Sequence, residues 1–164
     1  MAASRPDHGV EVPEAPRSTR QMQYQLAGTG TQRALDPRAP RSTGPLVLVV
    51  DDDADMVRFI GAVLQSRGVE TVAAFDAIQG FLVAQRQLPQ AILVDWHMPA
   101  GGGPQLLRRL RDQARTNAIP VVVITADTSE LVPEQAMSLG ARSMLAKPVT
   151  PEQLIEAISP HLGL

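Results

Sequence analysis

The sequence predicts an α/β fold in which a five-stranded parallel, doubly wound sheet carries helices on both faces, with a disordered tail in front of it. Three observations lead to this prediction. From residue 46 onward, short apolar runs alternate five times with helix-like patterns, which is the order expected of βα units. The runs at 46–50, 91–94 and 120–124 are almost continuously apolar, as in strands buried on both faces. Acidic, basic and hydroxyl side chains stand directly after the apolar runs, so the polar chemistry is expected at the strand ends.

The first strand is predicted at Leu46–Val50, and a helix follows it. Asp53 is the expected N-cap of that helix, which runs to about Arg67. Gly68 is its expected C-terminal stop, because glycine adopts the left-handed conformation at little cost. Val69–Ala74 is less apolar and is predicted as a weaker second strand.

The middle of the chain contributes the second helix and the third βα unit. Asp76 is predicted to cap a helix that extends to about Gln87. Ala91–Val94 is predicted as the third strand. A loop over 96–103 follows and ends in three glycines, and a helix is expected over Pro104–Arg115.

The fourth strand is predicted at Pro120–Ile124. Ser129 is the expected N-cap of a helix that ends at Gly140, with Pro133 in the first turn, where a proline is tolerated. Arg142–Ala146 is predicted as the fifth strand.

The last helix has the strongest start signal in the chain. Thr150 is the expected N-cap, Pro151 occupies the first helical position, and Gln153 lies three residues after the cap. This combination is typical of a capping box with proline at the first position. The helix is expected to run to about His161.

Composition separates a tail from a single domain. Residues 1–44 hold five prolines, six arginines and four acids, a net charge of about +2, and almost no apolar periodicity. Such a segment cannot bury enough apolar surface to offset the entropy of ordering it. We therefore predict a disordered Pro/Arg-rich tail over 1–44 and one folded domain over 45–164.

Other broad classes of protein are excluded or disfavoured. The chain has no cysteine, so disulfide, thiolate-zinc and cysteine-nucleophile chemistry are excluded. No apolar run approaches the length of a membrane span. Residues 1–20 show no apolar leader region. The cytoplasm is therefore the expected location.

Five polar side chains are predicted to converge at one edge of the sheet. They follow the first, third, fourth and fifth strands, and they are Asp51, Asp52, Asp95, Thr125 and Lys147. Ligands of doubly wound sheets bind at the carboxyl ends of the strands, so this edge is the expected functional site. Lys147 is the only lysine beside fourteen arginines. Its compact ammonium suits a single oxygen atom better than a planar guanidinium does.

The types of these residues indicate Mg²⁺-dependent phosphoryl chemistry. Three crowded carboxylates raise one another's pKa unless a cation lies between them. Mg²⁺ prefers oxygen ligands and keeps room for phosphate oxygens. A carboxylate can itself accept a phosphoryl group as an acyl phosphate. The metal and Lys147 would then neutralise charge on the transferred group, and Thr125 would offer its hydroxyl to a phosphoryl oxygen.

The sequence around these residues resembles the receiver domain of bacterial two-component response regulators. The spacing agrees with the family, with 43 residues from Asp52 to Asp95, 30 more to Thr125 and 22 more to Lys147. The resemblance covers about 46–164 and implies a flavodoxin-like sheet with strand order 2-1-3-4-5. The motifs that carry it are Val49-Val50-Asp51-Asp52-Asp53, Val94-Asp95-Trp96-His97-Met98-Pro99 with Gly103, Val123-Ile124-Thr125-Ala126-Asp127, Leu139-Gly140-Ala141 and Ala146-Lys147-Pro148.

The resemblance implies how a phosphoryl group and Mg²⁺ would be held. Asp95 would be the phosphoacceptor and also a metal ligand. Asp52 would bind the metal directly, Asp51 largely through water, and His97 through its backbone carbonyl. Lys147 would pair with the phosphoryl group.

The resemblance also implies how the switch would operate. Thr125 would move its hydroxyl toward the phosphoryl group. The side chains of His97 and Asp127 would lie at the mouth of the site and tune the lifetime of the phosphoryl group. Met144 stands where the family usually has tyrosine or phenylalanine, so the readout position is methionine, which can still repack. Pro148 implies an unusual peptide geometry after the lysine.

The expected function is a phosphorylation-controlled signalling switch, not an enzyme beyond its own phosphorylation and dephosphorylation. The expected partners are a histidine kinase or phosphotransfer protein and an unknown downstream protein. No DNA-binding segment is predicted after the domain. One alternative is a phosphorylation-independent interaction module on a receiver fold, which Met144 favours and the intact acidic site disfavours. A metal-dependent phosphatase would need an aspartate where His97 stands.

Overall fold

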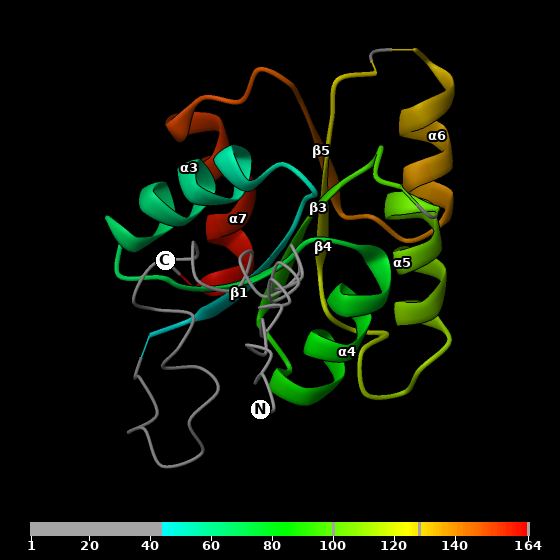
Figure 1. Cartoon of the computed structure of the whole chain (residues 1–164), viewed down its shortest axis with the longest axis horizontal. Helices are drawn as coiled ribbons and strands as arrows, with labels where there is room; N and C mark the ends of the chain where they lie inside the picture. The colour runs from blue at the N-terminus through cyan, green and yellow to red at the C-terminus, as the bar shows by residue number, and fades with distance from the viewer. Residues whose placement is uncertain (1–43, 100, 128, 164) are drawn as a thin grey trace, which may run out of the picture.

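A computed structural model of the chain describes residues 44–99, 101–127 and 129–163 (Figure 1). The predicted tail over 1–44 lies outside these residues except for Gly44. Within the described residues, five strands alternate with five helices. The strands are β1 (Leu46–Val50), β2 (Glu70–Ala74), β3 (Ala91–Asp95), β4 (Val121–Thr125) and β5 (Ser143–Ala146). The helices are α3 (Ala54–Gln65), α4 (Ala77–Gln87), α5 (Gly102–Arg111), α6 (Leu131–Ser138) and α7 (Pro151–Leu162).

The five strands form one parallel sheet in the order β2-β1-β3-β4-β5, which confirms the predicted topology. The chain starts in the middle of the sheet and winds outward in both directions, so a switch point lies between β1 and β3. The register aligns the strand ends, since Val50 lies opposite Val94 and Thr125 lies opposite Ala146. Residues that follow these ends therefore meet at one edge.

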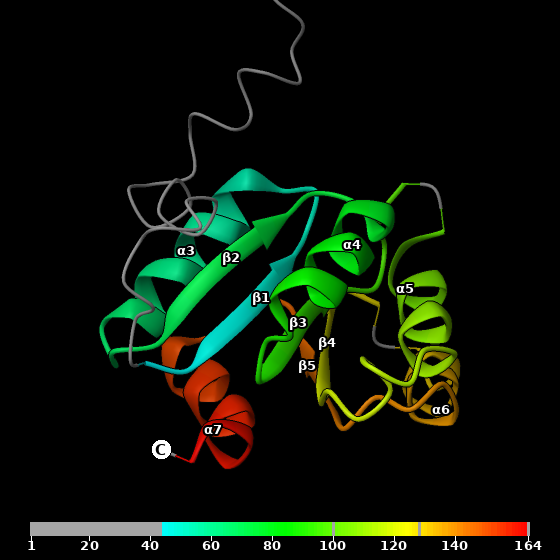
Figure 2. The ribbon, with the colours of Figure 1, turned by 90° about the horizontal axis from the view of Figure 1, so that it is seen from below.

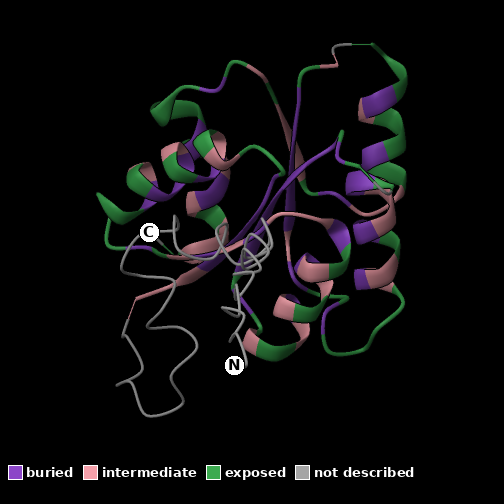
Figure 3. Ribbon diagram, in the orientation of Figure 1, coloured by how far each residue is buried: buried purple, intermediate pink, exposed green. Residues whose placement is uncertain are grey.

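Helices cover both faces of the sheet. α3 and α7 lie on one face, and α4, α5 and α6 lie on the other (Figure 1 and Figure 2). Each face has its own core: Leu48 and Val50 of β1 pack on the α4–α5–α6 side, whereas Val47 and Val49 pack on the α3–α7 side. The central strands are buried along their length (Figure 3). Burial on both faces is the reason that these strands read as continuous apolar runs.

Three helices begin as the sequence predicts. The carboxylate of Asp53 accepts a backbone hydrogen bond from the first turn of α3 at 2.8 Å. Asp76 accepts one from the backbone N–H of Gln79 at 2.7 Å, in the first turn of α4. Thr150 and Gln153 form the complete capping box at the start of α7. Each cap satisfies a backbone N–H that the helix itself leaves without an acceptor.

The predicted N-cap at Ser129 is wrong. The N-cap of α6 is Glu130, whose side chain makes no capping hydrogen bond. The backbone N–H of Ser129 instead donates to the carboxylate of Asp127 at 2.8 Å. An aspartate two residues earlier therefore organises the turn in front of the helix. Pro133 does lie in the first turn of α6, as predicted.

Helix α5 is shifted toward the N-terminus from its predicted range of 104–115. It starts earlier because the glycines themselves form the turn, with φ of 94° at Gly101 and 49° at Gly102. It ends earlier because the buried hydroxyl of Thr116 donates to the carbonyl of Leu110 at 2.9 Å. That bond closes the last turn, and the chain then leaves the helix.

The remaining boundaries differ by a few residues. β2, β4 and β5 each start one residue later than predicted, β3 includes Asp95 and β4 includes Thr125. α3 ends at Gln65, so Gly68, with φ of 73°, shapes the turn after the helix instead of ending it directly. No helix in the described part of the chain is both long enough and apolar enough to cross a membrane.

Candidate functional site

Three carboxylates form a cluster at the carboxyl edge of β1 and β3. Asp51, Asp52 and Asp95 each offer an oxygen atom, and these atoms lie within 4.8 Å of one another. Asp51 and Asp95 are 2% and 5% exposed, whereas Asp52 is exposed to solvent. The backbone N–H of Asp53 donates to Oδ1 of Asp51 at 2.8 Å, which fixes that carboxylate in the turn after β1. The sheet thus brings together the acids that the sequence places at two strand ends.

Lys147 meets two of these carboxylates. Its Nζ lies 2.8 Å from Oδ1 of Asp95 and 3.3 Å from Oδ2 of Asp51. The lysine side chain is 23% exposed, so its charge stands between solvent and the two buried acids. The backbone N–H of Lys147 donates to the carbonyl of Thr125 at 2.7 Å, and the following Lys147–Pro148 peptide bond is cis. The chain after β5 therefore carries the ammonium across to the acids of β1 and β3.

At this cluster, burial and contact with an opposite charge shift each pKa in opposite directions. Burial raises the pKa of Asp51 above its usual value, although the hydrogen bond from Asp53 and the charge of Lys147 oppose the shift. Burial by itself lowers the pKa of Lys147, but its hydrogen bond to Asp95 and the charges of Asp51 and Asp95 outweigh burial. The pKa of Lys147 is therefore raised, and the ammonium is retained at neutral pH. One ammonium compensates part of the negative charge at this edge.

Thr125 lies at the same edge and is fully buried. Its Oγ1 accepts a hydrogen bond from the backbone N–H of Asp127 at 3.0 Å. A hydroxyl that accepts one bond still has its own proton to donate. Thr125 is the last residue of β4, opposite Ala146, which places it at the carboxyl edge of the sheet.

His97 and Asp127 face each other across two loops that border the cluster. Nε2 of His97 lies 3.4 Å from Oδ2 of Asp127, and the two side chains are 60% and 37% exposed. The backbone N–H of Ser129 lowers the pKa of Asp127 by donating to its carboxylate, and His97 contributes in the same direction. The contact joins the loop after β3 to the loop after β4, and no pattern in the sequence predicts that the two side chains pair.

The glycines before α5 allow a close approach to the site. A Cβ atom on Gly102 would lie 2.5 Å from the carbonyl oxygen of Trp96, and one on Gly103 would lie 3.0 Å from the carbonyl oxygen of Asp95. Trp96, the only tryptophan, is buried beside them. The three consecutive glycines were the signal in the sequence, but their contact with the backbone of Asp95 and Trp96 is visible only in the fold.

The cluster fits a hard divalent cation. Its donor set consists of carboxylate oxygens, which Mg²⁺ prefers. One of its acids, Asp51, is buried with a raised pKa, so a bound cation would relieve a real electrostatic penalty. Asp52 faces solvent, which leaves room for water and phosphate oxygens around an ion. The same edge holds a lysine and a hydroxyl, the groups that stabilise a phosphoryl group.

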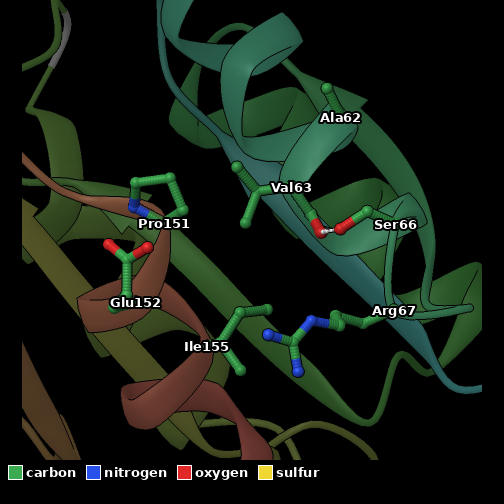
Figure 4. Close-up of a pocket in the computed structure, with 7 residues that line it drawn as sticks. All are labelled: Ala62, Val63, Ser66, Arg67, Pro151, Glu152 and Ile155. Carbon is green, nitrogen blue, oxygen red and sulfur yellow. Dashed lines mark hydrogen bonds between the residues drawn. The ribbon is translucent and has the colours of Figure 1, made fainter.

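A separate groove of about 360 Å³ lies between α3 and α7 (Figure 4). Arg67 stands on the α3 side and Glu152 on the α7 side. None of the predicted site residues lines this groove. The residues that line the groove are Ala62, Val63, Ser66, Arg67, Pro151, Glu152 and Ile155.

Comparison with known proteins identifies the family that this chain resembles. The family model described as the response regulator receiver domain matches residues 47–159. Protein PilH of Pseudomonas aeruginosa is 33% identical over 117 residues, which are 71% of this chain and 97% of PilH. The phosphate regulon transcriptional regulatory protein PhoB of the same species is 33% identical over 112 residues, which are 68% of this chain and 49% of PhoB. The chain thus spans about half the length of the first curated relatives that it matches.

Solved structures agree with the fold. The receiver domain of the sensor histidine kinase PA1611 from Pseudomonas aeruginosa is 29% identical, with a TM-score of 0.69 over 74% of this chain and 100% of that chain. That structure has a magnesium ion coordinated in its active site cleft.

Proposed function

The chain belongs to the response regulator receiver domain family, and from that premise we propose that it is a phosphorylation-controlled signalling switch whose phosphoacceptor is Asp95. The receiver domain family acts in two-component signalling. One observation supports Asp95 above the neighbouring acids: the buried Asp95 carboxylate lies 2.8 Å from Nζ of Lys147 and within the three-carboxylate cluster. An acceptor needs a cation for the transferred group and access from solvent; Asp95 contacts Lys147 and shares the cluster with Asp52, which is exposed.

The proposed reaction is transfer from a phosphohistidine of a histidine kinase or phosphotransfer protein. One carboxylate oxygen of Asp95 attacks the phosphorus atom, an O–P bond forms and the P–N bond breaks. The leaving imidazole nitrogen keeps the electron pair and takes a proton. Lys147 neutralises charge on the transferred group, and the hydroxyl of Thr125 donates to one of its oxygens.

We propose that Asp52, Asp95 and the backbone carbonyl of His97 hold Mg²⁺, with Asp51 acting largely through water. The metal, when bound, neutralises charge on the phosphoryl oxygens. Asp51 is the most restrained of the acids, since it already accepts from Asp53 and Lys147. That restraint favours an indirect role through water. The cytoplasm, where ATP-derived phosphodonors are made, is the proposed compartment.

The pair of His97 and Asp127 supports a role in phosphoryl lifetime. The two side chains lie 3.4 Å apart, in the loops that follow β3 and β4. While they pair, they narrow the approach of water to the acyl phosphate of Asp95. Loss of either partner is therefore proposed to speed hydrolysis, while leaving the phosphoacceptor intact.

The output is proposed to begin at Thr125 and to end at Met144. When the hydroxyl of Thr125 turns toward the phosphoryl group, it gives up the bond from Asp127 that it now accepts at 3.0 Å. Met144 lies on the neighbouring strand β5 and packs against the core on the α4–α5–α6 side. A methionine side chain can follow the shift by changing rotamers, which alters the surface offered to a downstream protein.

The test uses Trp96, which is buried next to the acceptor. Its fluorescence is followed while Mg²⁺ and then beryllofluoride or a small phosphodonor are added, and the mass of the protein is measured in parallel. We expect one change with Mg²⁺, a second change with the donor, and a mass gain of one phosphoryl group. Asp95→Asn should lose the second change and the mass gain. Asp55→Asn, in the first turn of α3 and paired with Arg58, is the matched control and should keep both.

A mass gain that persists in Asp95→Asn would assign the phosphoryl group elsewhere. A wild-type protein that gains no mass with any donor would contradict the switch. The working model would then be a phosphorylation-independent interaction module, for which the methionine at position 144 is the supporting feature.

A further inference from the structure

Helix α6 is held very differently at its two ends. At the C-terminal end, the backbone N–H of Ala141 donates to the carbonyl of Ala136, and that of Gly140 donates to the carbonyl of Met137, each at 2.9 Å. Gly140 has φ of 90°, so these two bonds form a complete Schellman motif with glycine in the left-handed position. Ala136 and Ala141 are also buried in the core on the α4–α5–α6 side. The C-terminal end of α6 is therefore firmly fixed in the fold.

The side chain of Arg111, in the last turn of α5, adds a second hold on the same turn. Its Nη2 donates to the carbonyl of Gly140 at 2.7 Å. Its Nη1 donates to the carbonyl of Asn117 at 2.9 Å and to that of Ile119 at 3.1 Å. A planar guanidinium can direct its donors at several acceptors at once, and all three acceptors here are backbone carbonyls. Arg111 thus ties the turn after α6 to the segment that leads into β4.

The N-terminal end of α6 has much weaker support. Its N-cap, Glu130, makes no side-chain hydrogen bond. The backbone N–H of Val132 reaches the carbonyl of Ser129 only at 3.4 Å, which is long for a hydrogen bond. Val132 packs in the core, but apolar packing is non-directional. Leu131, the first residue of the helix, is 74% exposed. The N-terminal end is therefore the end that can move.

A short series of hydrogen bonds leads from the proposed switch hydroxyl to this end of the helix. The backbone N–H of Asp127 donates to Oγ1 of Thr125 at 3.0 Å. The backbone N–H of Ser129 then donates to the carboxylate of Asp127 at 2.8 Å, and the carbonyl of Ser129 faces the N–H of Val132 in the first turn of α6. A displacement at Thr125 therefore reaches the end of α6 that lies away from Arg111.

We propose that Arg111 is a positioning residue that makes the turn at Gly140 the fixed end of α6, so that movement at Thr125 tilts the helix about that turn. This inference rests on the proposed function, because it takes Thr125 as the switch. Leu131 and Met137 precede Gly140 by nine and three residues, or about 14 Å and about 5 Å of helix. A tilt about Gly140 displaces position 131 about threefold more than position 137, whereas a translation of the helix displaces both equally.

Spin labels can measure the two displacements, because the chain has no cysteine of its own. One label is attached at Gln65→Cys, an exposed position at the end of α3, on the other face of the sheet. The second is attached at Leu131→Cys or at Met137→Cys, whose native side chains are 74% and 52% exposed. Both distances are measured in the full chain with Mg²⁺, before and after addition of beryllofluoride, which stands in for the phosphoryl group.

We expect the distance from position 65 to position 131 to shift about threefold more than the distance from 65 to 137. Equal shifts at the two positions, or a larger shift at 137, would overturn the proposal. Binding of beryllofluoride, seen by Trp96 fluorescence, without a shift at either position would also overturn it.

Two substitutions that release the fixed end should abolish the difference between the two shifts. Arg111→Met removes all three donors, and Gly140→Ala places a Cβ atom 2.6 Å from Nε of Arg111 and displaces the guanidinium. In each variant we expect the ratio of the shifts to fall from about three toward one. Arg108→Met, at an exposed arginine of the same helix, is the matched control and should keep the ratio. A loss of stability alone would leave the ratio unchanged, so a ratio that stays near three in both variants would contradict the role of Arg111.

The hold on the C-terminal end can also be tested without phosphorylation. Before beryllofluoride is added, the distribution of distances from 65 to 137 should be narrower than that from 65 to 131. Arg111→Met should widen the first distribution until the two match. Equal widths in the wild type, or widths that Arg111→Met leaves unchanged, would overturn the proposal. A protein with the expected widths that gains no mass from any phosphodonor would contradict the proposed switch while supporting Arg111 as the anchor of α6.

Discussion

At the scale of single residues, the charge of Lys147 is shared between two acids from different strands. The 2.8 Å contact to Asp95 and the 3.3 Å contact to Asp51 keep those buried carboxylates together without a metal ion. The sequence identifies Lys147 as special because it is the only lysine. Its contact with both acids depends on how the strand ends lie at the edge of the sheet. An arginine at this position could not place one compact charge between both oxygens.

Replacement of this lysine should destabilise the protein and make it depend on Mg²⁺. We expect Lys147→Met to lower the free energy of unfolding by about 1–3 kcal/mol, less than for a fully buried pair because the lysine is partly exposed. Urea unfolding without and with Mg²⁺ measures the effect, and Mg²⁺ should restore part of the loss. Arg142→Met, at an exposed basic residue, is the control. An unchanged midpoint for Lys147→Met would show that the contacts with Asp51 and Asp95 contribute little.

Asp51 should make stability depend on pH. Its pKa in the folded protein is raised above the ordinary 3.8, chiefly by burial, so between these two values the folded state holds more protons than the unfolded state. Stability therefore falls as pH rises through that window, and the charged form is a net cost above it. We expect Asp51→Asn to be more stable than the wild type at pH 7 without Mg²⁺, with the difference shrinking toward pH 4. Urea midpoints over this range test the sign, and a destabilised variant at pH 7 would contradict it.

At the scale of helices and strands, the two hydroxyl residues in front of α6 and α7 are expected to contribute differently to stability. Thr150 caps α7 through a box that is complete in the structure, whereas Ser129 lies before α6 without capping it. We expect Thr150→Ala to cost about 1 kcal/mol and Ser129→Ala to stay within about 0.5 kcal/mol. Thermal or urea unfolding of both variants provides the measurement. Equal losses would mean that the hydroxyl of Ser129 supports α6 in a way that its geometry does not indicate.

The glycines at the start of α5 should tolerate no side chain. A Cβ atom on Gly102 would lie 2.5 Å from the carbonyl oxygen of Trp96, and its φ is 49°. We expect Gly102→Ala to destabilise the protein by about 2 kcal/mol or more, since backbone strain and displacement combine, and to change Trp96 fluorescence. Gly61→Ala, inside α3 where the nearest atom would be 3.5 Å away, should be neutral or stabilising by up to about 1 kcal/mol. A neutral Gly102→Ala would show that the loop before α5 can relax.

At the scale of the whole molecule, metal binding should be coupled to folding. The ligand oxygens of the cluster come from the ends of β1 and β3, so the site exists only when the sheet is formed. At 100 times its dissociation constant, Mg²⁺ should stabilise the fold by about 2.7 kcal/mol. Unfolding with increasing Mg²⁺ measures this, and Asp52→Asn should remove most of the gain. Equal stabilisation of wild type and Asp52→Asn would place the ion elsewhere.

The order of elements could be predicted because its signals are local. Continuous apolar runs identify buried strands, and caps such as Asp53 and Thr150 act within one helical turn. The position of the site could be predicted for a related reason, since residues that follow parallel strands must meet at one edge. The predictions for Ser129 and for the C-terminal end of α5 were wrong because Asp127 and Thr116 redirect the backbone there, and α5 starts earlier than predicted because Gly101 and Gly102 form its first turn. The roles of the individual site residues stay proposals, to be tested at Asp95.

By itself, the sequence determined the topology of the sheet and the edge at which the candidate site residues lie, because these follow from hydrophobic period and chain order. The tertiary structure decided what those residues touch. It placed Lys147 between two acids, paired His97 with Asp127 and left Ile78 and Leu82 of α4 exposed. Contacts of this kind depend on distances between side chains that are far apart along the chain, and only the packed sheet and helices set those distances.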